Sequence, residues 1–94
     1  MKVSQLINRN GNPAANQFVI RHNGEVFFQS YNSLVAKIDN ENVLHLSPYW
    51  DYSNTTMKHL RIFLDDYGYN YSSSKEIRSA IKRGEIKYEN NLSV

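Results

Sequence analysis

The dipeptide Asn23-Gly24, which lies between two apolar segments, is the feature that most restricts how this chain can fold. Asn-Gly accepts the positive φ angles of a type I′ turn, whose twist matches that of the strands on either side. The segments 17–22 and 25–31 are therefore predicted to form a β-hairpin. The turn fixes the cross-strand pairs as His22 with Glu25, Ile20 with Phe27, and Phe18 with Gln29. Because both faces of this hairpin carry apolar side chains, we expect helices on one face and loops or a partner on the other.

Two further apolar segments, 34–38 and 43–46, flank a polar loop of four residues, 39–42. This is a usual length for a hairpin connection, so the sheet is predicted to be an antiparallel meander. The segment 85–89 alternates apolar and charged residues and predicts a last strand at a sheet edge, where its charges would discourage further pairing. Asn32-Ser33 interrupts the apolar pattern as either a bulge or a turn.

Three segments have the apolar spacing of helices. The first is a short N-terminal helix around residues 3–7, which residues 10–13 end. The second runs from Ser53 or Asn54 through Asp66 and is closed by Gly68. The third begins at the capping box of Ser73 and Glu76 and ends at Gly84. The expected fold class is α+β. Residues 1–94 would form a small single domain with an antiparallel sheet of about four to five strands, packed by two helices plus the short N-terminal helix.

Composition excludes several functional classes. The chain has no Cys, which excludes disulfides, Fe–S clusters and cysteine nucleophiles. No apolar run approaches the roughly 18 residues of a membrane-spanning helix. The three His residues have no metal-ligand spacing, and neither a G-x-S-x-G elbow nor a Gly-rich phosphate loop is present. We therefore expect no metal, no cofactor and no membrane partner. The net charge of +2 is too small for a general polyanion-binding field.

Three large aromatic residues, Tyr49, Trp50 and Tyr52, crowd the start of the expected central helix. One interpretation is structural, with Trp50 and Tyr52 packed against the sheet and Asp51 or Ser53 capping the helix. The other is functional, because exposed aromatic rings beside cations suit recognition of a phosphate or an acidic partner.

The charges of this helix favour the second interpretation. Lys58, His59 and Arg61 come early in the helix, whereas Asp65 and Asp66 come late. The helix dipole prefers the opposite order, and each misplaced charge costs some tenths of a kcal/mol. We infer that an external negative group compensates the cations. The alternative is an ordinary solvated face on which Arg61 pairs with Asp65, four residues later.

Tyr67, Tyr69 and Tyr71 alternate with Gly68 and Asn70 just after this helix. Loops rich in Tyr, Gly, Asn and Ser are typical of adaptable binding surfaces, because Tyr offers a large contact area at low rotamer cost. These three residues are therefore further candidate binding residues, with plain packing as the alternative.

The chain also resembles a family of short bacteriophage and mobile-element proteins to which no activity is attached. The residues that carry the resemblance are 16–20, the Phe-Phe-Gln-Ser-Tyr stretch at 27–31, the Tyr-Trp-Asp-Tyr-Ser-Asn-Thr-Thr-Met-Lys stretch at 49–58, Gly84 after the Lys- and Ile-rich helix, and Asn91-Leu92. An insertion-like stretch near 67–74 departs from the pattern. The resemblance implies a small protein in the cytoplasm of a host bacterial cell that binds and blocks a host target.

Two functions follow as hypotheses. The first is a non-enzymatic phage accessory protein that inhibits a host protein with an acidic or nucleic-acid-like surface, such as a CRISPR or other immune component. The second is a module that binds nucleic acid or a phosphorylated nucleotide through the same cations, with Trp50 or Tyr52 stacking on a base. An enzyme built from His59, Asp65 and Tyr52 is third, because no spacing favours it. An exposed apolar hairpin face would indicate a dimer.

Overall fold

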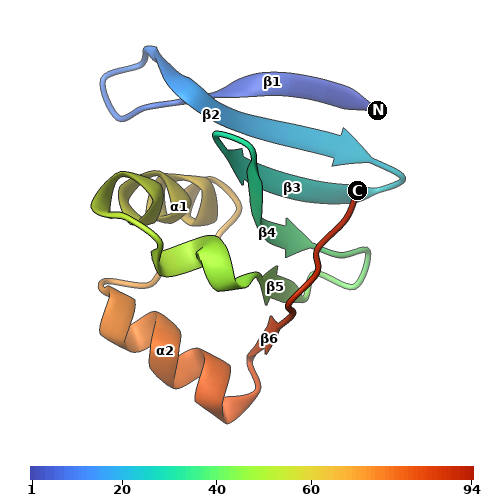
Figure 1. Cartoon of the computed structure of the whole chain (residues 1–94), viewed down its shortest axis with the longest axis vertical. Coiled ribbons are helices and arrows are strands. Elements are labelled where there is room, and N and C mark those ends of the chain that lie inside the picture. Colours follow the sequence, from blue (N-terminus) through green and yellow to red (C-terminus); the bar gives the residue numbers. More distant parts are fainter.

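The computed structural model describes residues 1–94 as one six-stranded sheet with its helices packed on one face (Figure 1). The strands follow one another across the sheet in chain order from β1 to β6. The elements are β1 (Lys2–Ile7), β2 (Pro13–His22), β3 (Glu25–Ser30), β4 (Ser33–Ile38), β5 (Leu44–Leu46), the 3₁₀ helix η1 (Pro48–Asp51), α1 (Asn54–Asp66), α2 (Ser74–Arg83) and β6 (Ile86–Tyr88). The α+β class is confirmed, but the sheet has six strands rather than four to five.

The β2–β3 hairpin has the predicted turn and register. Asn23 and Gly24 have φ angles of 52° and 80°, as a type I′ turn requires. Ile20 lies opposite Phe27, and the pairs on either side also match the prediction. A Cβ added at Gly24 would lie only 2.5 Å from the side-chain amide of Asn40, so this turn packs against the loop between β4 and β5.

The predicted N-terminal helix is wrong, because residues 2–7 form strand β1. β1 pairs antiparallel with β2, with Val3 opposite Ile20 and Ser4 opposite Val19. The helical spacing of Val3, Leu6 and Ile7 was misleading, since only Leu6 is buried. A helix this short is unstable in isolation, whereas pairing with the long strand β2 satisfies its backbone groups.

The predicted second hairpin is confirmed as β4 and β5, which pair antiparallel. The Asp39 carboxylate organises the loop between them, because its Oδ1 accepts hydrogen bonds from the backbone N–H groups of Glu41 and Val43, both at 2.9 Å. The predicted last strand is also present at a sheet edge, but β6 pairs parallel with β5. The chain returns to the sheet through η1, α1 and α2, and such crossovers produce parallel pairs. The meander is therefore antiparallel only from β1 to β5.

Helix α1 begins and ends close to the predicted positions. Ser53 is its N-cap and accepts a hydrogen bond from the Thr56 backbone N–H at 3.1 Å. After the helix, Gly68 has a φ of 85°, and the Tyr69 backbone N–H returns to the Leu64 carbonyl at 2.8 Å.

Helix α2 is capped by Ser73 and closed by Gly84, as predicted. The Glu76 backbone N–H donates to the Ser73 hydroxyl, whereas the Glu76 side chain accepts from the hydroxyl of Ser72 at 2.6 Å. The capping box is therefore displaced by one residue from its usual reciprocal form.

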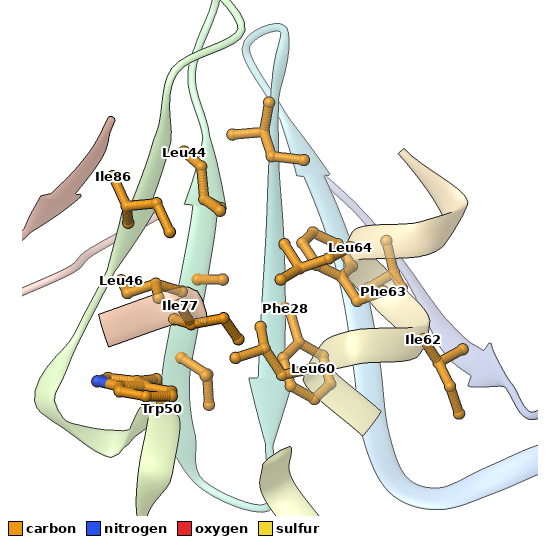
Figure 2. Packing of buried hydrophobic residues seen from close by; sticks show 14 of the residues in the cluster. Phe28, Leu44, Leu46, Trp50, Leu60, Ile62, Phe63, Leu64, Ile77 and Ile86 are labelled. Carbon is orange, nitrogen blue, oxygen red and sulfur yellow. The ribbon is translucent and has the colours of Figure 1, made fainter. Parts of the chain in front are cut away.

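The main hydrophobic core lies between the helices and the sheet face that carries Val19, Phe28, Ala36 and Leu46. We call this the helix face. Figure 2 shows Leu60, Phe63 and Leu64 of α1 gathered near Phe28. The Phe28 and Phe63 rings stack with their centroids 5.5 Å apart. Each fully buried Phe contributes about 1.5–3 kcal/mol through the hydrophobic effect.

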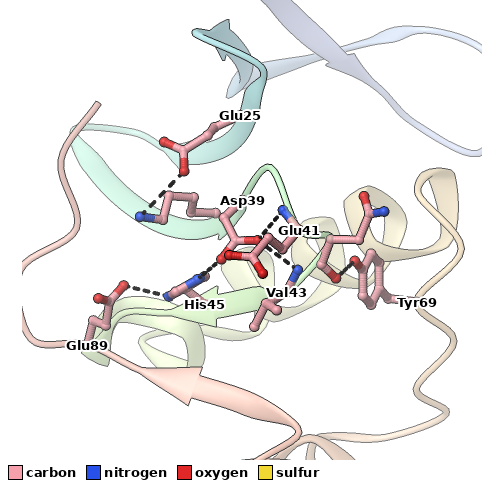
Figure 3. A network of polar contacts seen from close by, with 9 residues as sticks. Glu25, Asp39, Glu41, Val43, His45, Tyr69 and Glu89 are labelled. Atoms are coloured by element: carbon pink, nitrogen blue, oxygen red, sulfur yellow. Dashed lines mark hydrogen bonds and ion pairs between the residues drawn. The ribbon is translucent and has the colours of Figure 1, made fainter.

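The opposite face, which we call the outer face, carries Ile20, Phe27, Lys37 and His45 in one cross-strand row. The chain reaches this face after β6. The Glu89 backbone N–H donates to the Leu46 carbonyl, and Glu89 Oε2 lies 2.8 Å from Nδ1 of His45 (Figure 3). The two atoms are close but lack the alignment of a hydrogen bond.

His45 also connects to the β4–β5 loop, because its Nε2 lies 2.7 Å from Oδ2 of Asp39. The pKa of Asp39 is held below its ordinary value of 3.8. The main cause is the hydrogen bond from His45, followed by the hydrogen bonds from the backbone N–H groups of Val43 and Glu41. The same imidazole thus joins the loop before β5 to the segment after β6.

This network predicts a loss of stability in acid. A carboxylate whose pKa is depressed by folding stabilises the protein above its unfolded pKa, and the contribution disappears as the pH falls through the folded value. The free energy of unfolding should therefore decrease as the pH falls below about 3.8. Urea unfolding of wild type and Asp39→Asn at neutral and acidic pH tests this, because Asn keeps an acceptor oxygen for the backbone N–H groups. An equal loss in both proteins would contradict the role of Asp39.

None of the helices combines the length and the apolar composition that crossing a membrane requires.

Candidate binding surface

Three tyrosines that are unusually exposed for their size gather around one groove. Tyr31 follows β3, Tyr49 lies on η1, and Tyr52 lies between η1 and α1, with 53%, 47% and 79% of their surfaces exposed. The groove has a volume of about 450 Å³, within the range of small-ligand and side-chain pockets. It is lined by Ser30, Tyr31, Asn32, Ser33, Val35, Tyr49, Tyr52 and Thr56, none of which carries a charge. We call it the tyrosine groove.

The groove is held together by contacts between the sheet and α1. The hydroxyls of Ser30 and Thr56, both buried, lie 3.0 Å apart and join the end of β3 to the first turn of α1. The Ser47 hydroxyl donates to the Leu34 carbonyl at 2.6 Å and so fixes the start of η1 against β4. The walls of the groove are therefore built on rigid elements.

Tyr31 is the groove residue that the sequence analysis missed. Its φ of 56° lies in the left-handed region, which is uncommon for an aromatic residue. Its backbone N–H donates to the Asn16 carbonyl, and its carbonyl accepts from the Gln29 side chain, both at 2.7 Å. Strained backbone held by its surroundings is concentrated at functional sites. The interruption of the apolar pattern at Asn32-Ser33 was the available signal, but the turn between β3 and β4 is formed by Tyr31 and Asn32, and Ser33 is the first residue of β4.

Trp50 does not offer a free ring for stacking. It is buried in the core on the helix face, as the structural interpretation predicted. Arg78 of α2 lies over its ring, 5.2 Å from the centroid, and forms an ion pair with Asp51 at 3.3 Å. Trp50 and Asp51 of η1 therefore both contact Arg78 and hold η1 against α2.

Lys58 and Arg61 are exposed on α1, and neither forms an ion pair. The alternative in which Arg61 pairs with Asp65 is wrong, because Asp65 binds Arg9 at 3.0 Å instead. With Asn54, Met57 and Ser74, the two cations line a hollow of about 190 Å³. We call it the cationic hollow.

The groove and the hollow border the same first turns of α1, since Thr56 lines one and Asn54 and Met57 line the other. We define the η1–α1 surface as Tyr31, Tyr49, Tyr52, Lys58 and Arg61.

The other predicted residues lie elsewhere or are already bonded. His59 is half-buried, and its Nδ1 lies 2.8 Å from the Thr55 carbonyl. Tyr67, Tyr69 and Tyr71 are half-buried against the core and line neither the groove nor the hollow.

Two of these three tyrosines are fixed by hydrogen bonds. The Tyr67 hydroxyl accepts from Arg21 at 2.7 Å, and the Tyr69 hydroxyl donates to the Asn42 carbonyl. Burial, with a smaller effect of the Asp39 charge, raises the pKa of Tyr69, and burial followed by the Glu85 charge raises that of Tyr71. The hydroxyls of Tyr69 and Tyr71 therefore stay protonated. All three tyrosines have the surroundings of packing residues.

The proposed enzymatic trio is not assembled as a bonded unit, since Asp65 binds Arg9 and His59 contacts its own helix backbone. No group of three or more His, Asp or Glu side chains is placed to hold a metal ion.

Comparison with known proteins places the chain in a family. The model of a family of unknown function, DUF8033, matches residues 1–79. The chain belongs to this family. All five residues of the η1–α1 surface lie within the matched range, whereas Glu89 and β6 lie beyond it. No curated protein and no solved structure matches this DUF8033 member.

Proposed function

We propose that this DUF8033 member is a non-enzymatic binding protein that engages an acidic protein through the η1–α1 surface. The supporting observation is the pair of exposed cations, Lys58 and Arg61, which have no acidic partner within the chain. Lys58 is the fifth and Arg61 the eighth of the thirteen residues of α1, so neither lies in the last turn, where the helix dipole would favour a cation. An external carboxylate would compensate them, which is a functional reason for their position.

The two hollows suit different parts of one partner. The tyrosine groove has no charged lining residue and would accept an apolar or aromatic side chain, which supplies the buried anchor of an interface. Lys58 and Arg61 would pair with carboxylates around that anchor, which speeds association and selects an acidic surface.

The biological setting proposed here rests on the resemblance to phage and mobile-element proteins. In that setting the partner is a host defence protein, such as a CRISPR component, and binding in the host cytoplasm inhibits it. A small chain with a preformed surface acts as such an inhibitor by covering a functional face of its target.

A second candidate function is binding of nucleic acid or a phosphorylated nucleotide. The observation that favours it is the position of the cationic hollow, which Asn54 and Ser74, the first residues of α1 and α2, help to line. Backbone N–H groups at helix starts bind phosphate. With Trp50 buried, however, Tyr52 is the main ring left for base stacking. Titration with single strands, duplex and cyclic nucleotides at two salt concentrations tests it, because phosphate binding weakens as salt rises.

Affinity capture from host lysate tests the main proposal. We expect wild type to retain a specific partner that Lys58→Glu/Arg61→Glu fails to retain, because reversed charges repel an acidic surface. Lys75→Glu/Lys82→Glu on α2 is the matched control, since it makes the same change of net charge at two other exposed lysines. If wild type and the Lys58/Arg61 variant capture the same proteins, the two cations of the η1–α1 surface do not bind the partner.

A further inference from the structure

Strand β1 is a sheet edge without most of the usual protection. The opposite edge, β6, has three residues and carries exposed Lys87, whereas β1 has six residues and a single charge, Lys2. Its one irregularity lies between Gln5 and Ile7. Long edge strands present unpaired N–H and C=O groups to any second strand, and proteins usually block them with charges, proline or short length.

The exposed side chains of β1 are also apolar. Val3 and Ile7 have 55% and 48% of their surfaces exposed. Val3 lies opposite Ile20, which is buried, so the apolar row of the outer face continues to the edge and ends uncovered. A strand added beside β1 would cover this end of the row.

The charges at the two ends of β1 are of opposite sign and are not balanced locally. Lys2 lies directly opposite Arg21, and neither forms an ion pair. Like charges directly opposite one another are destabilising. Both residues lie on the helix face, because Arg21 donates to the Tyr67 hydroxyl just after α1.

At the other end, just past Ile7, Arg9 binds Asp65 and so places the acidic end of α1 beside the end of β1. The adjacent Asp66 is exposed and has no ion-pair partner. It also lines a hollow of about 320 Å³ together with four residues of β1, Val19 and Arg21 of β2, and Tyr67, although Arg21 donates to the Tyr67 hydroxyl and forms no ion pair with Asp66. An acidic residue at a helix C-terminus is disfavoured by the dipole.

We propose that two copies of this chain associate through their β1 strands, paired antiparallel about a two-fold axis near Gln5. In this register Val3 of each copy meets Ile7 of the other, so apolar side chains cover one another. The axis exchanges the two ends of the strand and brings Lys2 of each copy to the acidic end of α1, beside Asp66, in the other. In such a two-fold dimer, both copies use the same surface patch. The two sheets become one, and the dimer carries two η1–α1 surfaces, which permits bivalent binding.

Charge exchange between Lys2 and Asp66 tests the proposal, with mass measured by analytical ultracentrifugation over a range of concentrations. Wild type should reach twice the monomer mass of 11.0 kDa. Lys2→Glu and Asp66→Lys should each raise the dimer dissociation constant about tenfold, because each replaces two symmetric attractions by repulsions. Lys2→Glu/Asp66→Lys should restore the wild-type constant.

All three variants change exposed residues, so their folding is expected to be intact. Lys87→Glu on the opposite edge is the control and should leave the mass unchanged. A wild type that stays monomeric at every concentration overturns the proposal. A dimer that Lys2→Glu leaves intact also overturns it, because that dimer would use another surface. A double variant whose dimer dissociation constant is as high as those of the single variants overturns it as well.

Discussion

Phe28→Ala is expected to lower the free energy of unfolding by about 3–5 kcal/mol, the cost of removing a large aromatic ring from a closed core. Phe28 is fully buried on the helix face and stacks on Phe63, so neither the sheet nor α1 can easily collapse into the space left behind. Folded domains of this size have a total stability of roughly 0.05–0.15 kcal/mol per residue. One substitution would therefore remove a large part of the stability of this chain.

Urea unfolding measures this loss. Phe18→Ala is the matched control, because Phe18 lies on the neighbouring strand but is half-buried and outside the main core. We expect that variant to lose less than about 2 kcal/mol. Equal losses in the two variants would show that the core is not centred on the contact between β3 and α1.

Tyr49→Ala/Tyr52→Ala is expected to weaken binding of the protein partner by a factor of about 30 or more, the effect of removing an interface anchor worth about 2 kcal/mol. Both rings line the tyrosine groove and are exposed. Because exposed residues contribute little to the fold, stability should change by no more than about 0.5 kcal/mol. A loss of affinity without a loss of stability separates a binding role from a packing role.

Tyr88→Ala is the control for this prediction, since Tyr88 on β6 is exposed to a similar degree but lines neither the tyrosine groove nor the cationic hollow. Its affinity should match that of wild type when both are measured by isothermal titration. If the Tyr49/Tyr52 variant also binds as wild type does, the groove is not part of the interface.

The parts of the fold that sequence predicted well depend on local chemistry. The Asn23-Gly24 turn requires positive φ at both residues, and this alone set the register of β2 and β3. Ser53, Ser73 and Gly84 marked helix boundaries because their caps are formed by residues only a few positions away.

The errors occurred where distant pairing decides the structure. β1 has apolar spacing that fits a helix, and only its pairing with β2 makes it a strand, through partners that reach from Ile7 with Pro13 to Lys2 with Arg21. The parallel pairing of β5 with β6 depends on how the intervening helices return the chain to the sheet, which no local pattern encodes.

The candidate surface was predicted only in part for the same reason. Tyr49, Tyr52, Lys58 and Arg61 could be predicted as candidates because they lie within one short segment, and the structure exposes all four. Tyr31 lies in the β3–β4 turn, distant in sequence from that segment, and only the fold brings it to the groove. Trp50 and the three later tyrosines could not be assigned as buried from residue type, because Tyr and Trp serve packing and recognition equally well.

The central claim is that Lys58 and Arg61 are placed for an acidic protein partner rather than for stability. The most direct measurement is isothermal titration of the purified partner with wild type and with Lys58→Glu/Arg61→Glu at low and high salt, with thermal unfolding of both proteins in parallel. We expect wild type to bind more weakly as salt rises, and the variant to bind on the order of a hundredfold more weakly at low salt while its melting temperature does not fall. Equal affinities for the two proteins, or a loss of affinity accompanied by an equal loss of stability, would contradict the central claim.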